Sequence, residues 1–230
     1  MIDLKILGID TSGKTASVAV MDGDRILGEI SYVTRLTHSQ IILPLVKNLL
    51  EKLEIELEDI DCFAVSEGPG SYTGLRIGIS AVKGMCFTKD VKCYGVSTLK
   101  SLAQNVRFFG GIVVSVMHAR PGIAYFGAYE CKGGKLVEAV ADKVCKYEEI
   151  EEFVRNSDEK IMLVGDICEK IKGDLFSDLE RVEVAPASLK MQRASALCEL
   201  AFEENDSWVT GAELEARYLQ VTKAEKDLGK

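Results

Sequence analysis

The pattern of apolar and polar positions in the first half of the chain predicts three strands followed by alternating helices and strands. Strand-like runs cover residues 4–10, 15–21 and 25–33, and Asp22-Gly23 between the last two is typical of a hairpin turn. The pattern then predicts a helix over 37–53, a strand over 61–66, a helix over 74–88, a strand over 91–96 and a helix over 98–106. The first half is therefore βββαβαβα.

The second half is predicted to repeat this order, although no obvious residue identity joins the halves. Strands are expected over 111–118, 123–131 and 135–144, then a helix over 148–155, a strand over 160–165, a helix over 167–176, a strand over 181–184 and a helix over 190–204. A non-repeating tail follows Trp208. We therefore predict a duplicated α/β protein with two lobes, residues 1–107 and 108–230.

The start of the first predicted helix has two interpretations. Thr37-His38-Ser39-Gln40 fits a capping box that opens a helix directly. Pro44 is instead typical of a first turn or of a kink, because proline lacks the N–H that an interior helix position donates. Both interpretations remain open from the sequence.

Composition and charge narrow the possible functions. The chain has 230 residues, a net charge of −8 and a pI near 5.0, which argues against binding nucleic acid alone, because that needs a positive face. No apolar run approaches the roughly 20 residues that span a bilayer. No secretory signal is visible in MIDLKILGID, so we expect a cytoplasmic protein without a membrane contact.

Cysteine and histidine spacing predicts no metal site. The seven cysteines are scattered without a C-x-x-C pair and are expected to be reduced core residues. His38 and His118 are far apart, and neither has a second ligand three or four residues away.

A glycine-rich segment, EGPGSYTGLRIG at residues 67–78, follows the strand predicted over 61–66 and opens a helix. Converging backbone N–H groups and a helix N-terminus can bind a phosphate, which makes Gly68, Gly70 and Ser71 candidates for a nucleotide-facing loop. Tight strand-to-helix packing is the alternative, because glycine also allows close backbone approach. The segment alone does not decide between them.

Residues 8–15 match the Walker A string G-x-x-x-x-G-K-[ST], but their context differs. That motif needs a helix beginning at the lysine, whereas residues 16–21 are β-prone, so we interpret Ser12-Gly13-Lys14 as a hairpin tip. Asp10, Thr11 and Ser12 then stand at the end of the first strand. They either face a nucleotide-bound cation or close the turn by hydrogen bonds to the backbone.

Two βββαβαβα halves with an Asp-Thr-Ser turn resemble the superfamily of actin, sugar kinases and heat-shock ATPases (the ASKHA fold). Five segments make a closer match, namely ILGIDTS at 6–12, THSQIILP at 37–44, EGPGSYTGLRIG at 67–78, GVSTL at 95–99 and YLQVTKAE at 218–225. Together they resemble the bacterial TsaB (YeaZ) family, over nearly the whole chain.

This resemblance implies a role in making threonylcarbamoyladenosine next to the anticodon of tRNAs that read codons beginning with A. In the family, TsaB is a non-catalytic dimerisation subunit and its paralogue TsaD is the transferase, while TsaE is an accessory ATPase of the TsaB–TsaD pair. It further implies no catalytic residue and no stably bound cofactor in this chain, with ATP or ADP belonging to the complex. TsaD, TsaE through the complex, tRNA only through the complex, and a second copy of the chain when alone are the implied partners.

The resemblance places the TsaD contact on two helices, about residues 38–53 and 74–88. Gly74, Gly78 and Gly84 together cost nearly 3 kcal/mol of helix propensity, and a closely approaching partner helix would offset that cost. The alternative is a helix pair buried within the chain. The candidate interface residues are His38, Ile42, Leu45, Leu49, Gly74, Gly78, Ala81 and Met85.

Some residues depart from the family pattern, and a competing function remains. His118 stands where relatives have a carboxylate, and Ala216 and Gln220 differ from the usual tail, so charge pairs made there by relatives are not carried over. The competing class is an ATPase or small-molecule kinase that uses Asp10 and the loop 68–74 around a nucleotide. A 230-residue chain leaves little material for the larger second lobe of such enzymes.

Overall fold

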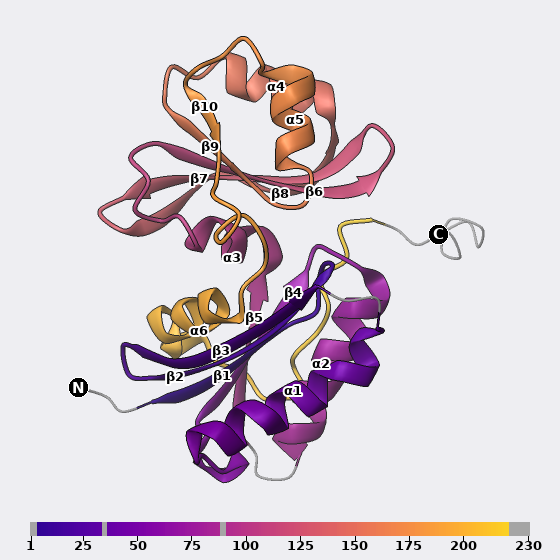
Figure 1. Ribbon diagram of the computed structural model, residues 1–230, viewed down its shortest axis with the longest axis vertical. Coiled ribbons are helices and arrows are strands. Elements are labelled where there is room, and N and C mark those ends of the chain that lie inside the picture. The colour runs from indigo at the N-terminus through magenta and orange to yellow at the C-terminus, as the bar shows by residue number, and fades with distance from the viewer. Residues whose placement is uncertain (1–3, 34–35, 88–90, 221–230) are drawn as a thin grey trace.

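The computed structural model describes residues 4–33, 36–87 and 91–220, which form two stacked lobes (Figure 1). Each lobe contains a five-stranded sheet, ordered β3-β2-β1-β4-β5 in the first and β10-β9-β6-β7-β8 in the second. These orders are equivalent when β6 is matched to β1, so the predicted duplication of an α/β fold is confirmed. Residue 88 of the predicted second helix and residues 221–225 of the last family motif lie outside the described residues.

The elements follow the predicted order in both halves. The first half comprises β1 (Lys5–Asp10), β2 (Thr15–Asp22), β3 (Arg25–Val33), α1 (His38–Leu53), β4 (Cys62–Gly68), α2 (Tyr72–Phe87), β5 (Lys92–Ser97) and α3 (Thr98–Gln104). The second comprises β6 (Ile112–Arg120), β7 (Ile123–Lys132), β8 (Lys135–Lys146), α4 (Tyr147–Arg155), β9 (Ile161–Val164), α5 (Cys168–Leu175), β10 (Val182–Val184) and α6 (Ala194–Glu203). Within the described residues, no helix has the length and apolar character needed to cross a membrane.

Helix α1 begins at its predicted cap and continues through Pro44. The backbone N–H of Thr37 donates to the Gln40 side chain at 3.1 Å, as a capping box requires. The helix therefore begins at the Thr37 capping box, and Pro44 lies inside it and not in its first turn.

The last helix of each half packs against the sheet of the other half. Helix α6 lies on β1 and β2 of the first sheet, opposite the face that α1 and α2 cover, while α3 packs on β6 and β7 (Figure 1). The approach of α6 to the sheet is close, because a Cβ at Gly8 would lie 2.5 Å from the Ala194 carbonyl oxygen. A boundary between residues 107 and 108 separates the two sheets, but the packing crosses it in both directions.

The tail after α6 returns to the first lobe. Val209 pairs with Cys93 on the edge strand β5 through two backbone hydrogen bonds of 2.8 and 2.9 Å. Leu214 is buried in the core under α1 and α2, and the Arg217 N–H donates to the Glu67 carbonyl at 2.7 Å. Helix α6 and residues 209–217, which follow the second sheet in sequence, therefore pack on the first lobe.

Candidate functional site: a closed cleft and an open helix face

The Walker-like string forms a hairpin. Strand β1 ends at Asp10 and β2 begins at Thr15, with an exposed Lys14 at the tip between them. No helix begins at Lys14, so the sequence-based interpretation of this segment is confirmed. The string lacks the helix N-terminus on which the phosphate-binding mechanism depends.

Asp10 is fully buried and closes the turn of its own hairpin. Its Oδ1 accepts hydrogen bonds from the Ser12 backbone N–H at 2.9 Å and from the Ser12 hydroxyl at 2.7 Å. Burial raises the pKa of the Asp10 carboxyl, and the nearby Ser66 hydroxyl and the hydrogen bonds from Ser12 oppose that rise. Asp10 and Ser12 thus close the turn, whereas the Thr11 hydroxyl donates to Gly74 on α2, and all three side chains are buried. The cation-facing role stays a prediction.

The glycine-rich loop packs against this hairpin. A Cβ at Gly70 would lie 2.4 Å from the Ser12 carbonyl oxygen, and the Ser71 N–H donates to that oxygen at 2.7 Å. A Cβ at Gly68, where φ is +127°, would lie 2.4 Å from the Arg217 carbonyl oxygen. The chain's own backbone occupies the space that these glycines leave open, which is the tight packing offered as the alternative, and the nucleotide-facing interpretation of Gly68, Gly70 and Ser71 stays a prediction.

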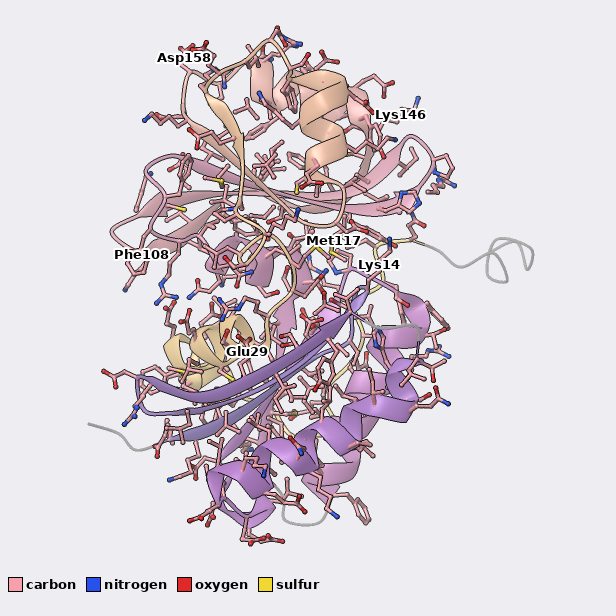
Figure 2. The ribbon with its side chains drawn as sticks, in the orientation of Figure 1. Lys14, Glu29, Phe108, Met117, Lys146 and Asp158 are labelled. Atoms are coloured by element: carbon pink, nitrogen blue, oxygen red, sulfur yellow. The ribbon has the colours of Figure 1, made fainter. Side chains whose placement is uncertain are left out.

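Side chains also fill the space between the lobes beside this hairpin. The buried Gln192 amide lies against Gly13, where a Cβ would be 2.7 Å from Nε2, and this Nε2 is 3.6 Å from the sulfur of Met117 on β6. Figure 2 shows Lys14 and Met117 on facing sides of the two lobes. The Gln192 amide and the Met117 sulfur therefore occupy the space next to Gly13.

The outer face of α1 and α2 is open instead. One groove of about 640 Å³ lies between the two helices, and a second of about 660 Å³ continues along α1. Leu43 lines both grooves and is 51% exposed. We call this surface the α1–α2 face; its first groove is lined by Ser39, Ile42, Leu43, Tyr72, Thr73, Arg76, Ile77, Ser80 and Ala81.

The predicted interface residues do not all lie on the α1–α2 face. Ile42 and Ala81 line the first groove, and Met85 lines the second. Leu45 and Leu49 are buried in the core of the first lobe. His38 lies at the start of α1, where its Nε2 is 2.8 Å from the Gly13 carbonyl oxygen.

Gly74 and Gly78 point into the chain and not toward a partner, which corrects the prediction. Thr11 Oγ1 donates to the Gly74 carbonyl at 2.7 Å, and a Cβ at Gly78 would lie 2.6 Å from the same Oγ1. The close neighbour that these glycines allow is therefore the β1–β2 hairpin. The buried-helix alternative is correct for this side of α2, whereas its opposite side forms the α1–α2 face.

Several residues of the α1–α2 face were missed from the sequence, namely Leu43, Tyr72, Thr73, Arg76, Ile77 and Ser80. The signal was present, because 72/73, 76/77 and 80/81 recur with helical spacing on the side opposite Gly74 and Gly78. Placing Gly74 and Gly78 on the outer side of the helix conceals this pattern.

Metal ligands and family departures add little to the site. Within the described ranges, no group of three or more His, Cys, Asp or Glu side chains is arranged to hold a metal ion, and the predicted absence of metal stays a prediction.

His118 is exposed, and its backbone N–H donates to Asp166 at 2.8 Å. Ala216 packs at the edge of the first core, and Gln220 is the last described residue.

Comparison with known proteins places this geometry in a family. A family model described as "TsaD: tRNA N6-adenosine threonylcarbamoyltransferase" matches residues 27–215. The tRNA threonylcarbamoyladenosine biosynthesis protein TsaB of Bacillus subtilis (strain 168) is 33% identical over 162 residues, which are 70% of this chain and 71% of that protein. The chain belongs to the TsaB family, whose members are paralogues of TsaD.

Solved structures agree with this membership. YeaZ from Pseudomonas aeruginosa superposes with a TM-score of 0.77 at 26% identity, over 94% of this chain and all of that one. The ROK hexokinase from Thermus thermophilus superposes with a TM-score of 0.50 at 11% identity, over 89% of this chain and all of that one. The second likeness shows the predicted sugar-kinase-like fold alone, so the site of this TsaB-family chain is argued from its own residues.

Proposed function

We propose that this chain is the non-catalytic dimerisation subunit of the complex that forms threonylcarbamoyladenosine in tRNA, and that it pairs with TsaD through the α1–α2 face. The observation that carries the proposal is the contrast between the two sides of the first lobe. The cleft side is filled by Asp10, Ser12 and Gln192 of the chain itself, whereas the α1–α2 side leaves Leu43 half exposed over two grooves.

The division of labour follows from this contrast. TsaD supplies the transfer chemistry, and ATP or ADP and the tRNA are held by the complex and not by this acidic chain. TsaE acts on the assembled pair in the cytoplasm. When TsaD is absent, a second copy of the chain covers the α1–α2 face, since an exposed apolar surface of this kind favours association.

A charge introduced at Leu43 tests the proposal. Leu43→Glu places a carboxylate at the centre of the α1–α2 face, where a bound partner would have to bury it. We expect TsaD binding, measured by calorimetry, to weaken by about 2–4 kcal/mol, or roughly thirty- to a thousandfold. The matched control is Asn48→Glu, an exposed position on the same helix that lines neither groove.

The two variants separate pairing from folding. Both are expected to melt as the unchanged chain does, since neither position is buried. Equal TsaD affinities for Leu43→Glu and Asn48→Glu would mean that TsaD binds elsewhere.

A further inference from the structure

The end of the tail lies against the rim of the α1–α2 face. The Tyr218 ring centroid is 4.7 Å from that of Tyr72, and the Arg76 Nε–H donates to the Tyr218 hydroxyl at 3.0 Å. Tyr72 and Arg76 both line the groove between the helices. A residue 142 positions beyond Arg76 therefore contacts two side chains of the groove wall from outside the groove.

Arg76 lies against the Tyr72 ring, beside the contact between the two rings. Its guanidinium carbon is 4.1 Å from the Tyr72 ring centroid and 6.0 Å from that of Tyr218. Such contacts attract a cation to the aromatic face and restrict a long side chain before any partner arrives. A side chain ordered in advance lowers the entropic cost of association, and arginine and tyrosine are enriched among the residues that dominate binding energy.

The position of Tyr218 is set by anchors deeper in the tail. Val209 pairs with Cys93 on β5, Leu214 is buried in the first core, and the Arg217 N–H bonds to Glu67 on β4. The Arg217 carbonyl oxygen also fills the space left by the absent side chain of Gly68. A change at Tyr218, which is partly exposed, leaves all of these anchors in place.

From these contacts we propose that the tail is a built-in part of the TsaD-binding surface, with Tyr218 as the residue that positions Arg76 and Tyr72. The inference rests on the proposed function and deepens it, because it adds a third segment to the α1–α2 face. The surface fits an amphipathic helix of TsaD whose apolar side enters the groove over Ile42 and Ile77 and whose end packs against the two rings and the guanidinium.

Two substitutions at one position test this inference. Tyr218→Ala removes the ring and is expected to weaken TsaD binding about five- to tenfold, without a change in melting temperature. Tyr218→Phe keeps the ring contacts with Tyr72 and Arg76 and loses only the hydroxyl, so it should bind within about threefold of the unchanged chain. Rescue by phenylalanine distinguishes an effect of the ring from a general loosening of the tail.

A double-mutant cycle with Arg76→Ala tests whether Tyr218 acts through Arg76. In the Arg76→Ala background, Tyr218→Ala should weaken binding by a clearly smaller factor than in the unchanged chain, because one of the two side chains that it positions is gone. If the loss of TsaD binding free energy in the double variant equals the sum of the losses in the two single variants, the inference is wrong. This holds whether or not Tyr218→Ala lowers the melting temperature. If Tyr218→Ala binds normally while Leu43→Glu fails to bind, the tail proposal is wrong and the proposed function stands; if both bind normally, both are wrong.

Discussion

At the scale of single residues, three glycines determine how α2 and the loop before it meet the β1–β2 hairpin. The glycines at 70, 74 and 78 do allow close approach, as the sequence indicated, but the approaching group is the β1–β2 hairpin of the same chain. The need for a small side chain is local, whereas the identity of the neighbour depends on tertiary packing. A phosphate, a partner helix and the chain's own turn all require the same glycines.

Two glycines in α2 give the first prediction. Gly78→Ala places a methyl group 2.6 Å from Thr11 Oγ1 and 3.3 Å from Val65 Cγ2, so we expect a loss of about 1–3 kcal/mol in the free energy of unfolding. Gly84→Ala meets no atom within 4 Å and should stabilise the helix by up to about 1 kcal/mol. Urea unfolding of both variants checks this, and a stabilising Gly78→Ala would place Gly78 on an open surface.

Asp10 gives a prediction about pH. Burial raises its pKa, so the carboxyl binds its proton more tightly in the folded chain than in the unfolded chain, and stability falls as the pH rises through that window. Asp10→Asn removes this cost and keeps an oxygen that accepts from Ser12. The variant should be more stable than the unchanged chain at pH 7, and the difference should shrink as the pH falls toward the ordinary aspartate pKa of 3.8. A variant that is less stable at pH 7 would contradict this account of Asp10.

At the scale of helices and strands, nearly every element was predictable. Hydrophobic periodicity and turn residues are local signals, and they gave the order βββαβαβα in both halves. The exchange of α3 and α6 between the lobes was not predictable in this way. Both helices are apolar, and hydrophobic periodicity does not indicate which of the two sheets a helix packs against. A division at residue 107 separates the two sheets but not the helices that cover them.

The docking of α6 gives a prediction at this scale. Glu29 on β3 accepts hydrogen bonds from the Ser195 N–H at 2.9 Å and the Ser195 hydroxyl at 2.8 Å, and Arg193 bonds to its other oxygen. We expect Glu29→Ala to lower the free energy of unfolding by about 2–3 kcal/mol, mostly through the Ser195 bonds, since Arg193 is partly exposed.

An exposed ion pair supplies the control for Glu29. The Lys47 and Glu51 side chains are 78% and 62% exposed, so Glu51→Ala should change stability by less than about 0.5 kcal/mol. Equal effects of Glu29→Ala and Glu51→Ala in urea unfolding would show that Glu29 does not hold α6 on the first sheet.

At the scale of the whole molecule, a fold related to sugar kinases has a filled cleft and an open outer face. We therefore expect the purified chain to hydrolyse ATP no faster than buffer alone. Lys14→Ala should leave tRNA modification intact in cells, because Lys14 stands at an exposed hairpin tip. A turnover of ATP that disappears in Asp10→Ala would support the competing ATPase or kinase function.

The most direct test of the central claim is the level of threonylcarbamoyladenosine in tRNA from cells whose only copy of this gene carries Leu43→Glu. Mass spectrometry of tRNA nucleosides measures it, with Asn48→Glu as the control and equal protein levels verified in both strains. A chain that works through the α1–α2 face predicts loss of the modified nucleoside in the Leu43→Glu strain and a normal level in the control strain. A normal level in both strains would contradict the claim that this face carries the function.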